Sequence, residues 1–343
     1  MFAFALSDEE RLIQDTARRF ARDRLLPGLR AHERARGVPR ELARAFAGLG
    51  LDAAEIGTFA RALVLEELAA VDPSAALALD GLGPARDVLL EGGLGGLLTA
   101  LAQEPGCRGV VIDDVETHFH ARDGQLAGAH PWVPADTLAV LVVLQPGRAF
   151  VVREGWRLTP IATCGLEAAG GSRIVLDGAP IAATVDDARA LARGRARLQT
   201  SVAALLVGAA RGAHQYAMHY ATERTAFGRP IAHHQALAFL IADLATAVDV
   251  ARLALWHAAA ALDRGQTGEW EATSALAEAA EQALFVGPNA VQILGGHGFM
   301  KDHPVEKWMR DIRTLAQMAG GRDEAELAAA GLAPEHDVGL GAR

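Results

Sequence analysis

The chain has 343 residues, enough for several structural layers around a large core. Hydrophobic residues make up 51% of it but aromatic residues only 5%, so alanine, leucine and valine dominate and favour a helix-rich fold. A formal net charge of -9, without long runs of lysine or arginine, argues against a nucleic-acid-binding surface and against binding to anionic membranes.

The cysteines and the N-terminal segment indicate in which cellular compartment the protein is expected. Cys107 and Cys164 lie far apart and in no metal-ligand spacing, so we expect two reduced thiols. The N-terminal MFAFALSDEERL lacks a basic segment and turns acidic at Asp8, which argues against a secretory signal peptide. No stretch approaches the roughly 20 uninterrupted apolar residues of a membrane span. We therefore expect a soluble, cytoplasmic protein.

The first hundred residues show helical periodicity. Ser7 and Glu10 have capping-box spacing at the start of a helix predicted over residues 7–30, which Pro27-Gly28 ends. Further helices are predicted over residues 39–49, 56–71 and 74–90. We therefore expect residues 1–106 to form an N-terminal α-helical domain.

Near residue 107 the pattern changes to short apolar runs separated by proline and glycine. Asp123-Gly124 is typical of a tight β-hairpin turn. Strands are predicted over residues 109–112, 117–121, 138–144, 149–152, 156–158 and 172–176. Residues 107–185 are therefore predicted to form a small middle β domain.

Helical periodicity returns near residue 186. Helices are predicted over residues 188–222, 233–263, 270–286 and around 291–294, the last after a turn at Gly287-Pro288. Long helices joined by short loops indicate an antiparallel bundle, here a four-helix bundle within residues 186–343. We expect the short polar tail after Gly320 to be frayed at its end.

Two segments of the C-terminal half point to a specific chemistry. The first is Tyr220-Ala-Thr-Glu-Arg-Thr-Ala-Phe-Gly-Arg-Pro-Ile231, and the second is Val291-Gln-Ile-Leu-Gly-Gly-His-Gly-Phe299. An arginine beside a tight Phe-Gly turn can bind a diphosphate and place an aromatic ring against an adenosine. A glycine pair lets a flat ring or a phosphate approach the backbone. In this order, within a helical bundle, the two segments resemble those of the acyl-CoA dehydrogenase family.

The resemblance implies an α+β, acyl-CoA dehydrogenase-like fold and a FAD-dependent oxidoreductase of lipid metabolism. Such an enzyme introduces an alpha,beta double bond into an acyl-CoA and passes electrons to an electron-transfer flavoprotein or similar acceptor. In the family, the two segments contact the FAD of the neighbouring subunit. Carried over by position, the cofactor-binding residues are Arg224, Phe227, Gln235, Gln292, Gly295 and Gly296. Glu306, Arg310 and Asp311 also match family positions, and we interpret them as an ion-pair network.

The position of the catalytic base departs from the family pattern. In the family, a glutamate in a Tyr-Glu-Gly-Thr segment removes the proton alpha to the thioester. Here the segment is Gln317-Met-Ala-Gly-Gly321, so Ala319 occupies the usual glutamate position and cannot accept a proton. Some family members carry the glutamate on the preceding long helix, near the positions of Leu198 and Gln199, and neither of these is acidic.

The middle domain departs from the pattern too. The stretches Val111-Ile-Asp-Asp-Val115 and Pro131-Trp-Val-Pro134 stand where the family has the Thr-Glu-Pro and Trp-Ile-Thr segments that line the flavin. Trp132 is either an aromatic against the flavin ring or an ordinary core residue. The flavin half-site formed within this subunit therefore looks eroded, whereas the half-site offered to a neighbour looks retained.

These departures predict a base-lacking subunit of a heteromeric acyl-CoA dehydrogenase, an α2β2 heterotetramer with a homologous catalytic partner. Two-gene enzymes of this kind occur among bacterial enzymes of steroid catabolism, so a sterol side-chain CoA is one candidate substrate. Two alternatives stay open: a homo-oligomeric flavin-dependent monooxygenase-like protein, which needs no alpha-carbon base, and a non-catalytic structural subunit without FAD. His233 and His234 are adjacent and point to different helix faces, so no metal site is predicted.

Overall fold

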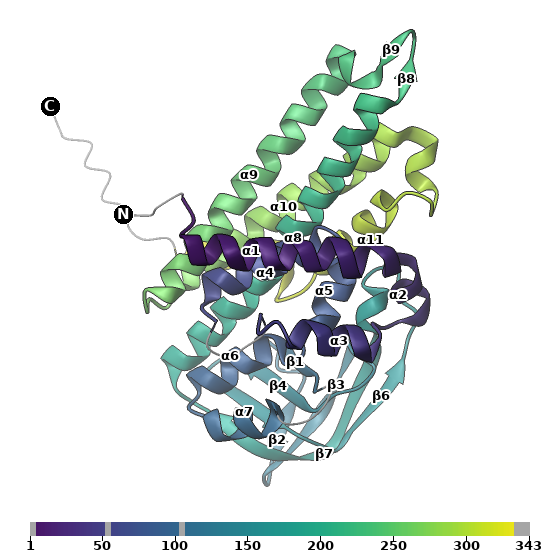
Figure 1. Cartoon of the computed structure of the whole chain (residues 1–343). Helices are drawn as coiled ribbons and strands as arrows, with labels where there is room; N and C mark the ends of the chain where they lie inside the picture. The colour runs from purple at the N-terminus through teal and green to yellow at the C-terminus, as the bar shows by residue number, and fades with distance from the viewer. Residues whose placement is uncertain (1–4, 52–55, 103–106, 333–343) are drawn as a thin grey trace, which may run out of the picture.

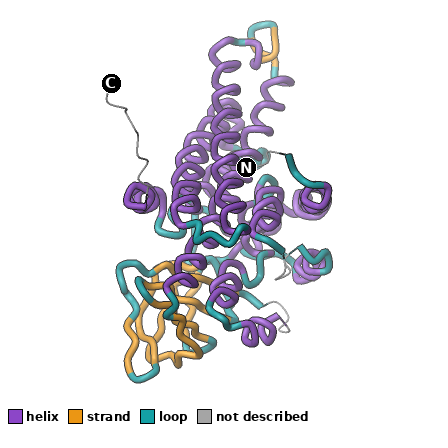
Figure 2. The backbone as a smooth tube through the Cα atoms, turned by 90° about the vertical axis from the view of Figure 1, so that its left-hand side faces the viewer, coloured by secondary structure: helices purple, strands orange, loops and turns teal. Residues whose placement is uncertain are grey.

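The computed structural model describes residues 5–51, 56–102 and 107–332. N-terminal helices and a bundle of long C-terminal helices share one hydrophobic core, and a small β-sheet region lies at one end of the molecule (Figures 1 and 2). At the opposite end, two long helices extend to a short hairpin (Figure 1). The predicted order of helical, β and helical parts is confirmed.

The N-terminal helices are α1 (Asp8–Phe20), α2 (Leu29–Ala35), α3 (Arg40–Ala47), α4 (Thr58–Ala69), α5 (Pro73–Leu79), α6 (Gly83–Glu91) and α7 (Gly95–Ala102). The predicted capping box is confirmed, because the Ser7 hydroxyl accepts from the Glu10 backbone N–H and the Glu10 carboxylate accepts from that of Ser7. The continuous helix predicted over residues 7–30 is wrong. A π-helical turn and a 3-10 turn around Pro27, which has no backbone donor, separate α1 from α2.

The single helix predicted over residues 74–90 is also wrong, because it is divided into α5 and α6. Between them, Asp80 leaves helical geometry and pairs with the buried Arg61, and Gly83 adopts a positive φ of 53°. The buried ion pair therefore ends the helix at Asp80, although a continuous helix is predicted there.

The strands are β1 (Gly109–Asp113), β2 (His120–Arg122), β3 (Gln125–Val133), β4 (Val140–Gln145), β5 (Arg148–Val152), β6 (Trp156–Pro160) and β7 (Ser172–Val185). Their order is β1-β4-β5-β7-β3-β2 with β6 paired to β7, and only the β1–β4 pairing is parallel among these described strands. The predicted turn at Asp123-Gly124 is confirmed, with φ of 50° and 75° between β2 and β3.

The strands differ from the prediction in three places. The strand predicted over residues 117–121 begins only at His120, because the Asp114 carboxylate binds the backbone N–H groups of His118 and Phe119 and holds a loop there. Strand β3 was not predicted. Strand β7 continues well beyond residue 176, because its second half pairs with β5.

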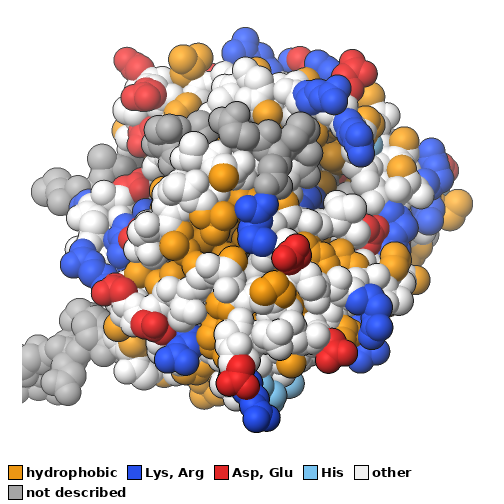
Figure 3. Space-filling model, turned by 90° about the horizontal axis from the view of Figure 1, so that it is seen from below, with side chains coloured by type: hydrophobic (Ala, Val, Ile, Leu, Met, Phe, Trp, Pro, Cys, Tyr) orange, Lys and Arg blue, Asp and Glu red, His pale blue; other side chains and the backbone are white. Residues whose placement is uncertain are grey.

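The C-terminal helices are α8 (Ala188–Glu223), α9 (Gln235–Asp263), α10 (Glu269–Leu294), α11 (Val305–Leu315) and α12 (Gly321–Leu332), with the hairpin strands β8 (Thr225–Ala226) and β9 (Arg229–Pro230). Glycines of α8 let α4 pack closely, since a Cβ at Gly212 would lie 2.1 Å from the Ala70 carbonyl oxygen. No helix of the described residues is long and apolar enough to cross a membrane. From the β end, acidic and basic side chains are interspersed over the surface (Figure 3).

Two C-terminal predictions are wrong. The turn predicted at Gly287-Pro288 is absent, because α10 continues through both residues and Gly287 packs against Met309 and Ile312 of α11. The polar tail predicted after Gly320 instead contains α12, which packs on α10 and buries Ala325. The frayed end predicted for that tail falls mainly on residues 333–343, which lie outside the described residues.

A buried ion triad joins the helical parts to the loop that precedes β7. The Lys307 ammonium donates to Asp72, the N-cap of α5, and to Asp311 of α11, both at 2.6 Å. Asp311 also accepts from the backbone N–H of Leu166 at 2.7 Å. Burial alone would lower the pKa of Lys307, but Asp311 and Asp72 raise it above its ordinary value.

Replacing Lys307 with methionine should lower the free energy of unfolding by about 3–5 kcal/mol, because two buried carboxylates lose the cation they share. Urea denaturation followed by circular dichroism measures this loss. The control is Arg322→Ala, which removes an exposed pair with Glu326 and should leave the midpoint nearly unchanged. Equal effects of the two variants would contradict a supporting role for the triad.

Candidate functional site

The hairpin between α8 and α9 presents one aromatic side chain to solvent. Phe227 and Gly228 form its turn with φ of 54° and 79°, a left-handed conformation that suits glycine but is rare for phenylalanine. The Phe227 residue is 96% exposed. Its ring meets the His234 ring edge-on, with 5.9 Å between centroids, and most of its surface stays exposed, which indicates a contact with another molecule.

Two polar side chains flank this hairpin. Arg224 is the C-cap of α8 and is exposed, and among the described residues its guanidinium has no hydrogen-bond or ion-pair partner. Gln235 begins α9 on the other side of the hairpin and is also exposed. An unpaired guanidinium with its five donors can bind a phosphate group bidentately.

The second segment forms the 3-10 turn η5 (Gly295–Phe299) at the end of α10. A Cβ built on Gly295 or Gly296 would meet nothing within 4 Å, so the backbone is open to close approach from outside. Gln292 is exposed on the last turn of α10. The Tyr220 hydroxyl lies 2.7 Å from His297 Nδ1, so the structure brings this turn beside the end of α8.

The helices that carry these segments also expose large apolar side chains. They include Met218 of α8, Phe239, Val250 and Leu253 of α9, Phe285 of α10, and Phe299 of η5. Apolar side chains exposed on one structural unit are typical of a surface that another chain covers.

Ala319 lies in the turn between α11 and α12. It has a φ of 56° and is followed by Gly320 and Gly321, which also have positive φ. It lines a cleft of about 220 Å³, together with Asp113, Arg195 and Gln199. Arg195 donates three hydrogen bonds to the Asp113 carboxylate. The Gln199 amide oxygen accepts from the Thr273 hydroxyl, so these polar groups are already paired.

The cleft also contains an acid that the sequence did not single out. A Cβ on Gly320 would lie 2.6 Å from Glu324 Oε2, so this carboxylate of α12 folds back toward the turn that contains Ala319. Burial raises the pKa of Glu324, and the nearby Asp113 raises it further. Glu324 was overlooked because its helix was predicted to be a polar tail.

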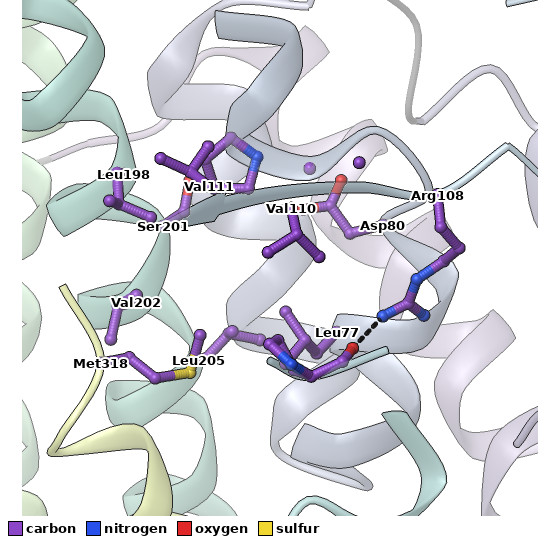
Figure 4. A pocket seen from close by; sticks show the side chains of 14 residues that line it. Leu77, Asp80, Arg108, Val110, Val111, Leu198, Ser201, Val202, Leu205 and Met318 are labelled. Atoms are coloured by element: carbon purple, nitrogen blue, oxygen red, sulfur yellow. Dashed lines mark hydrogen bonds between the residues drawn. The ribbon is translucent and has the colours of Figure 1, made fainter. Parts of the chain in front are cut away.

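A second, mainly apolar cavity lies between β1, α8 and Met318 (Figure 4). Leu198 and Val202 line one end of it and Arg108 the other (Figure 4). Burial lowers the pKa of Arg108 to about 10, and this side chain donates to the Pro134 carbonyl. The cavity measures about 40 Å³, far below the roughly 300–1,000 Å³ of ligand pockets. A flavin ring does not fit there.

The residues that replace the family's flavin-lining segments make contacts within this chain. The Trp132 ring packs against the hydrophobic core, while its Nε1 is shielded from solvent and has no hydrogen-bond partner among the described residues. Asp113 pairs with Arg195, and Asp114 caps the loop before β2. Asp113 and Asp114 are therefore engaged within the chain, whereas the groups at the far end of the bundle are exposed.

The remaining candidates behave as the sequence suggested. Glu306 pairs with Arg310, which also binds Glu33 of α2, and Asp311 binds Lys307. The Arg310 and Arg30 bonds lower the pKa of Glu33 although its burial opposes this. Within the described residues, no group of three histidine, cysteine or carboxylate side chains could hold a metal ion.

Comparison with known proteins decides the family. Family models described as acyl-CoA dehydrogenase N-terminal and C-terminal domains match residues 7–85 and 185–331. The chain is 30% identical to cyclohex-1-ene-1-carbonyl-CoA dehydrogenase of Geobacter metallireducens over 369 aligned positions, which cover 93% of this chain and 96% of that protein. This chain belongs to the acyl-CoA dehydrogenase family.

A second relative of this acyl-CoA dehydrogenase family member matches only part of its length, and a solved structure matches nearly all of it. It is 41% identical over 125 residues to an acyl-CoA dehydrogenase of Bacillus subtilis, a match that covers 36% of this chain and 33% of that protein. Butyryl-CoA dehydrogenase from Megasphaera elsdenii has the same fold, with a TM-score of 0.85 at 20% identity over 96% of this chain and 99% of that one.

Replacing Phe227 with alanine should change the free energy of unfolding of this family member by no more than about 0.5 kcal/mol, because an exposed ring contributes no burial. The matched control, Phe46→Ala, removes a ring that is 2% exposed and should cost about 3–5 kcal/mol. Chemical denaturation of the separated chain compares the two. A large loss for Phe227→Ala would mean that the ring supports the fold.

Proposed function

We propose that this protein is one subunit of a hetero-oligomeric, FAD-dependent acyl-CoA dehydrogenase and completes the FAD site of a homologous partner subunit. An asymmetry within the chain carries the proposal. At the hairpin end the groups are exposed and Arg224 has no partner in the described residues, whereas beside the β domain Asp113 is paired with Arg195 and Ala319 stands at the base position. An α2β2 assembly would pair each such chain with one complete active site.

The residues of this chain have distinct roles in the proposed site. Arg224 would hold the diphosphate of FAD, and Phe227 would pack against its adenosine. The Gly295-Gly296 backbone would lie close to the cofactor. Gln235 and Gln292 would supply amide hydrogen bonds, and both are exposed near these groups.

The chemistry requires a base that this chain lacks at the usual position. Bound FAD supplies the acceptor for the hydride that leaves the beta carbon, while a carboxylate must remove the alpha proton. Ala319 cannot do so, and the turn that carries it lies beside a cleft whose Asp113 is already paired with Arg195. Glu324 also lies in that cleft, near Gly320, but it does not stand at the family's base position, so we assign the proton to a carboxylate of the partner subunit.

The names of relatives support the proposed substrate class and electron acceptor. Two relatives that align over nearly the whole chain are named for cyclohex-1-ene-1-carbonyl-CoA and benzylmalonyl-CoA, which are CoA thioesters with cyclic groups. A sterol side-chain CoA is a candidate of the same general class. A partial match is a subunit of a caffeyl-CoA reductase-Etf complex, which supports an electron-transfer flavoprotein as the acceptor.

The purified assembly should contain two kinds of chain and one FAD per two chains. The reason is that only the partner has a complete flavin-lining domain, while each partner site needs one copy of this chain. Native mass spectrometry, together with flavin absorbance after denaturation, gives both ratios. A homo-oligomer with one FAD per chain would contradict the proposal and favour the monooxygenase-like alternative.

Arg224→Ala in that assembly should weaken FAD binding about 10- to 100-fold, because a charge-assisted hydrogen bond to phosphate is worth about 1.5–3 kcal/mol. The matched control is Arg264→Ala, since Arg264 is the exposed C-cap of α9 at the far end of that helix. FAD titration of the apo-assembly, followed by flavin fluorescence, compares them. Unchanged binding for Arg224→Ala would favour a structural subunit without cofactor contacts.

A further inference from the structure

A single side-chain hydrogen bond joins the two segments of the proposed cofactor-binding surface. The Tyr220 hydroxyl lies 2.7 Å from Nδ1 of His297, in the middle of the η5 turn. Tyr220 is one helical turn before Arg224, whose backbone N–H donates to the Tyr220 carbonyl at 2.8 Å. The bond therefore connects the end of α8, which carries Arg224, to the turn that carries Gly295 and Gly296.

The η5 turn packs on α10 through the buried Gly298, but its glycine pair has no such contact. Gly295 and Gly296 have no side chains, and open space surrounds the positions of their Cβ atoms. Within the described structure, the bond from Tyr220 is the only side-chain hydrogen bond to residues 295–299. The His297 ring also stacks on the ring of His303, with 5.7 Å between centroids and 18° between planes.

A second tyrosine–histidine pair lies one turn earlier on α8. The Tyr216 hydroxyl is 2.8 Å from Nδ1 of His303. Here the loop has independent support, because Arg30 of α2 donates to the carbonyls of Lys301 and His303, both at 2.9 Å. The two pairs are chemically alike, but only the Tyr220–His297 pair forms a hydrogen bond to the turn with the open glycines.

We propose that Tyr220 and His297 are positioning residues, which hold the Gly295–Phe299 turn in register with Arg224 so that one FAD contacts both. This inference rests on the proposed function and adds to it the device that joins the two contact sets. Because the glycines cannot hold the turn through side chains, loss of the bond lets the turn move while Arg224 stays in place.

Tyr220→Phe removes only the hydroxyl and tests the inference in the assembled oligomer. The dissociation constant for FAD should rise about fivefold. This is the change expected when one neutral hydrogen bond that orders the turn is lost. Tyr216→Phe is the matched control, and it should change the dissociation constant for FAD by less than about twofold. Equal effects of the two variants, or no effect of Tyr220→Phe, would overturn the inference.

The partner residue gives a rescue test. His297→Ala should weaken FAD binding as much as Tyr220→Phe does, and the double variant should be no worse than either single one. His297→Asn keeps a hydrogen-bonding atom near the place of Nδ1 and should restore binding to within about twofold of the original chain. Additive losses, or no recovery with asparagine, would show that the two residues act separately.

Hydrogen–deuterium exchange of this chain alone gives a readout that does not depend on cofactor or activity. Exchange of residues 295–300 should be faster in Tyr220→Phe and unchanged in Tyr216→Phe. If Arg224→Ala weakens FAD binding but Tyr220→Phe does not, this inference fails and the proposed function stands. If neither variant weakens it, the proposed function fails as well.

Discussion

The buried ammonium of Lys307 holds the helical parts of this protein against the loop that precedes β7. Its two carboxylate partners belong to α5 and α11, and one of them also binds the Leu166 backbone. Separating them would leave buried charges uncompensated, which disfavours any arrangement that moves α5, α11 and the Leu166 loop apart. Because α11 leads directly into the turn at Ala319, this docking also determines where the base position lies.

The molecule has opposite characters at its two ends. Near the β-sheet region, Asp113 and Arg108 bind other groups of the chain, and the apolar cavity beside Arg108 has no room for a flavin. At the hairpin end, the Phe227 ring, two open glycines and a guanidinium without a partner in the described residues face outward. A chain closed at its own site and open toward a neighbour is suited to supplying part of another subunit's site.

Local features were predicted well because they depend on residues close in sequence. The Ser7–Glu10 capping box and the Asp123-Gly124 turn are of this kind. Errors arose where distant contacts overrode local preference. Pro288 stays inside α10 because α11 packs on that helix, and β7 is long because β5 continues its pairing.

The sequence alone determined the family resemblance, the residues that can contact a cofactor, and the alanine at the base position, because these follow from residue type and short spacing. Only the tertiary structure decided which groups meet. Tyr220 and His297 are 77 positions apart in the chain, and Lys307 and Asp72 are 235 apart. Such contacts depend on how helices pack, and no local pattern encodes helix packing.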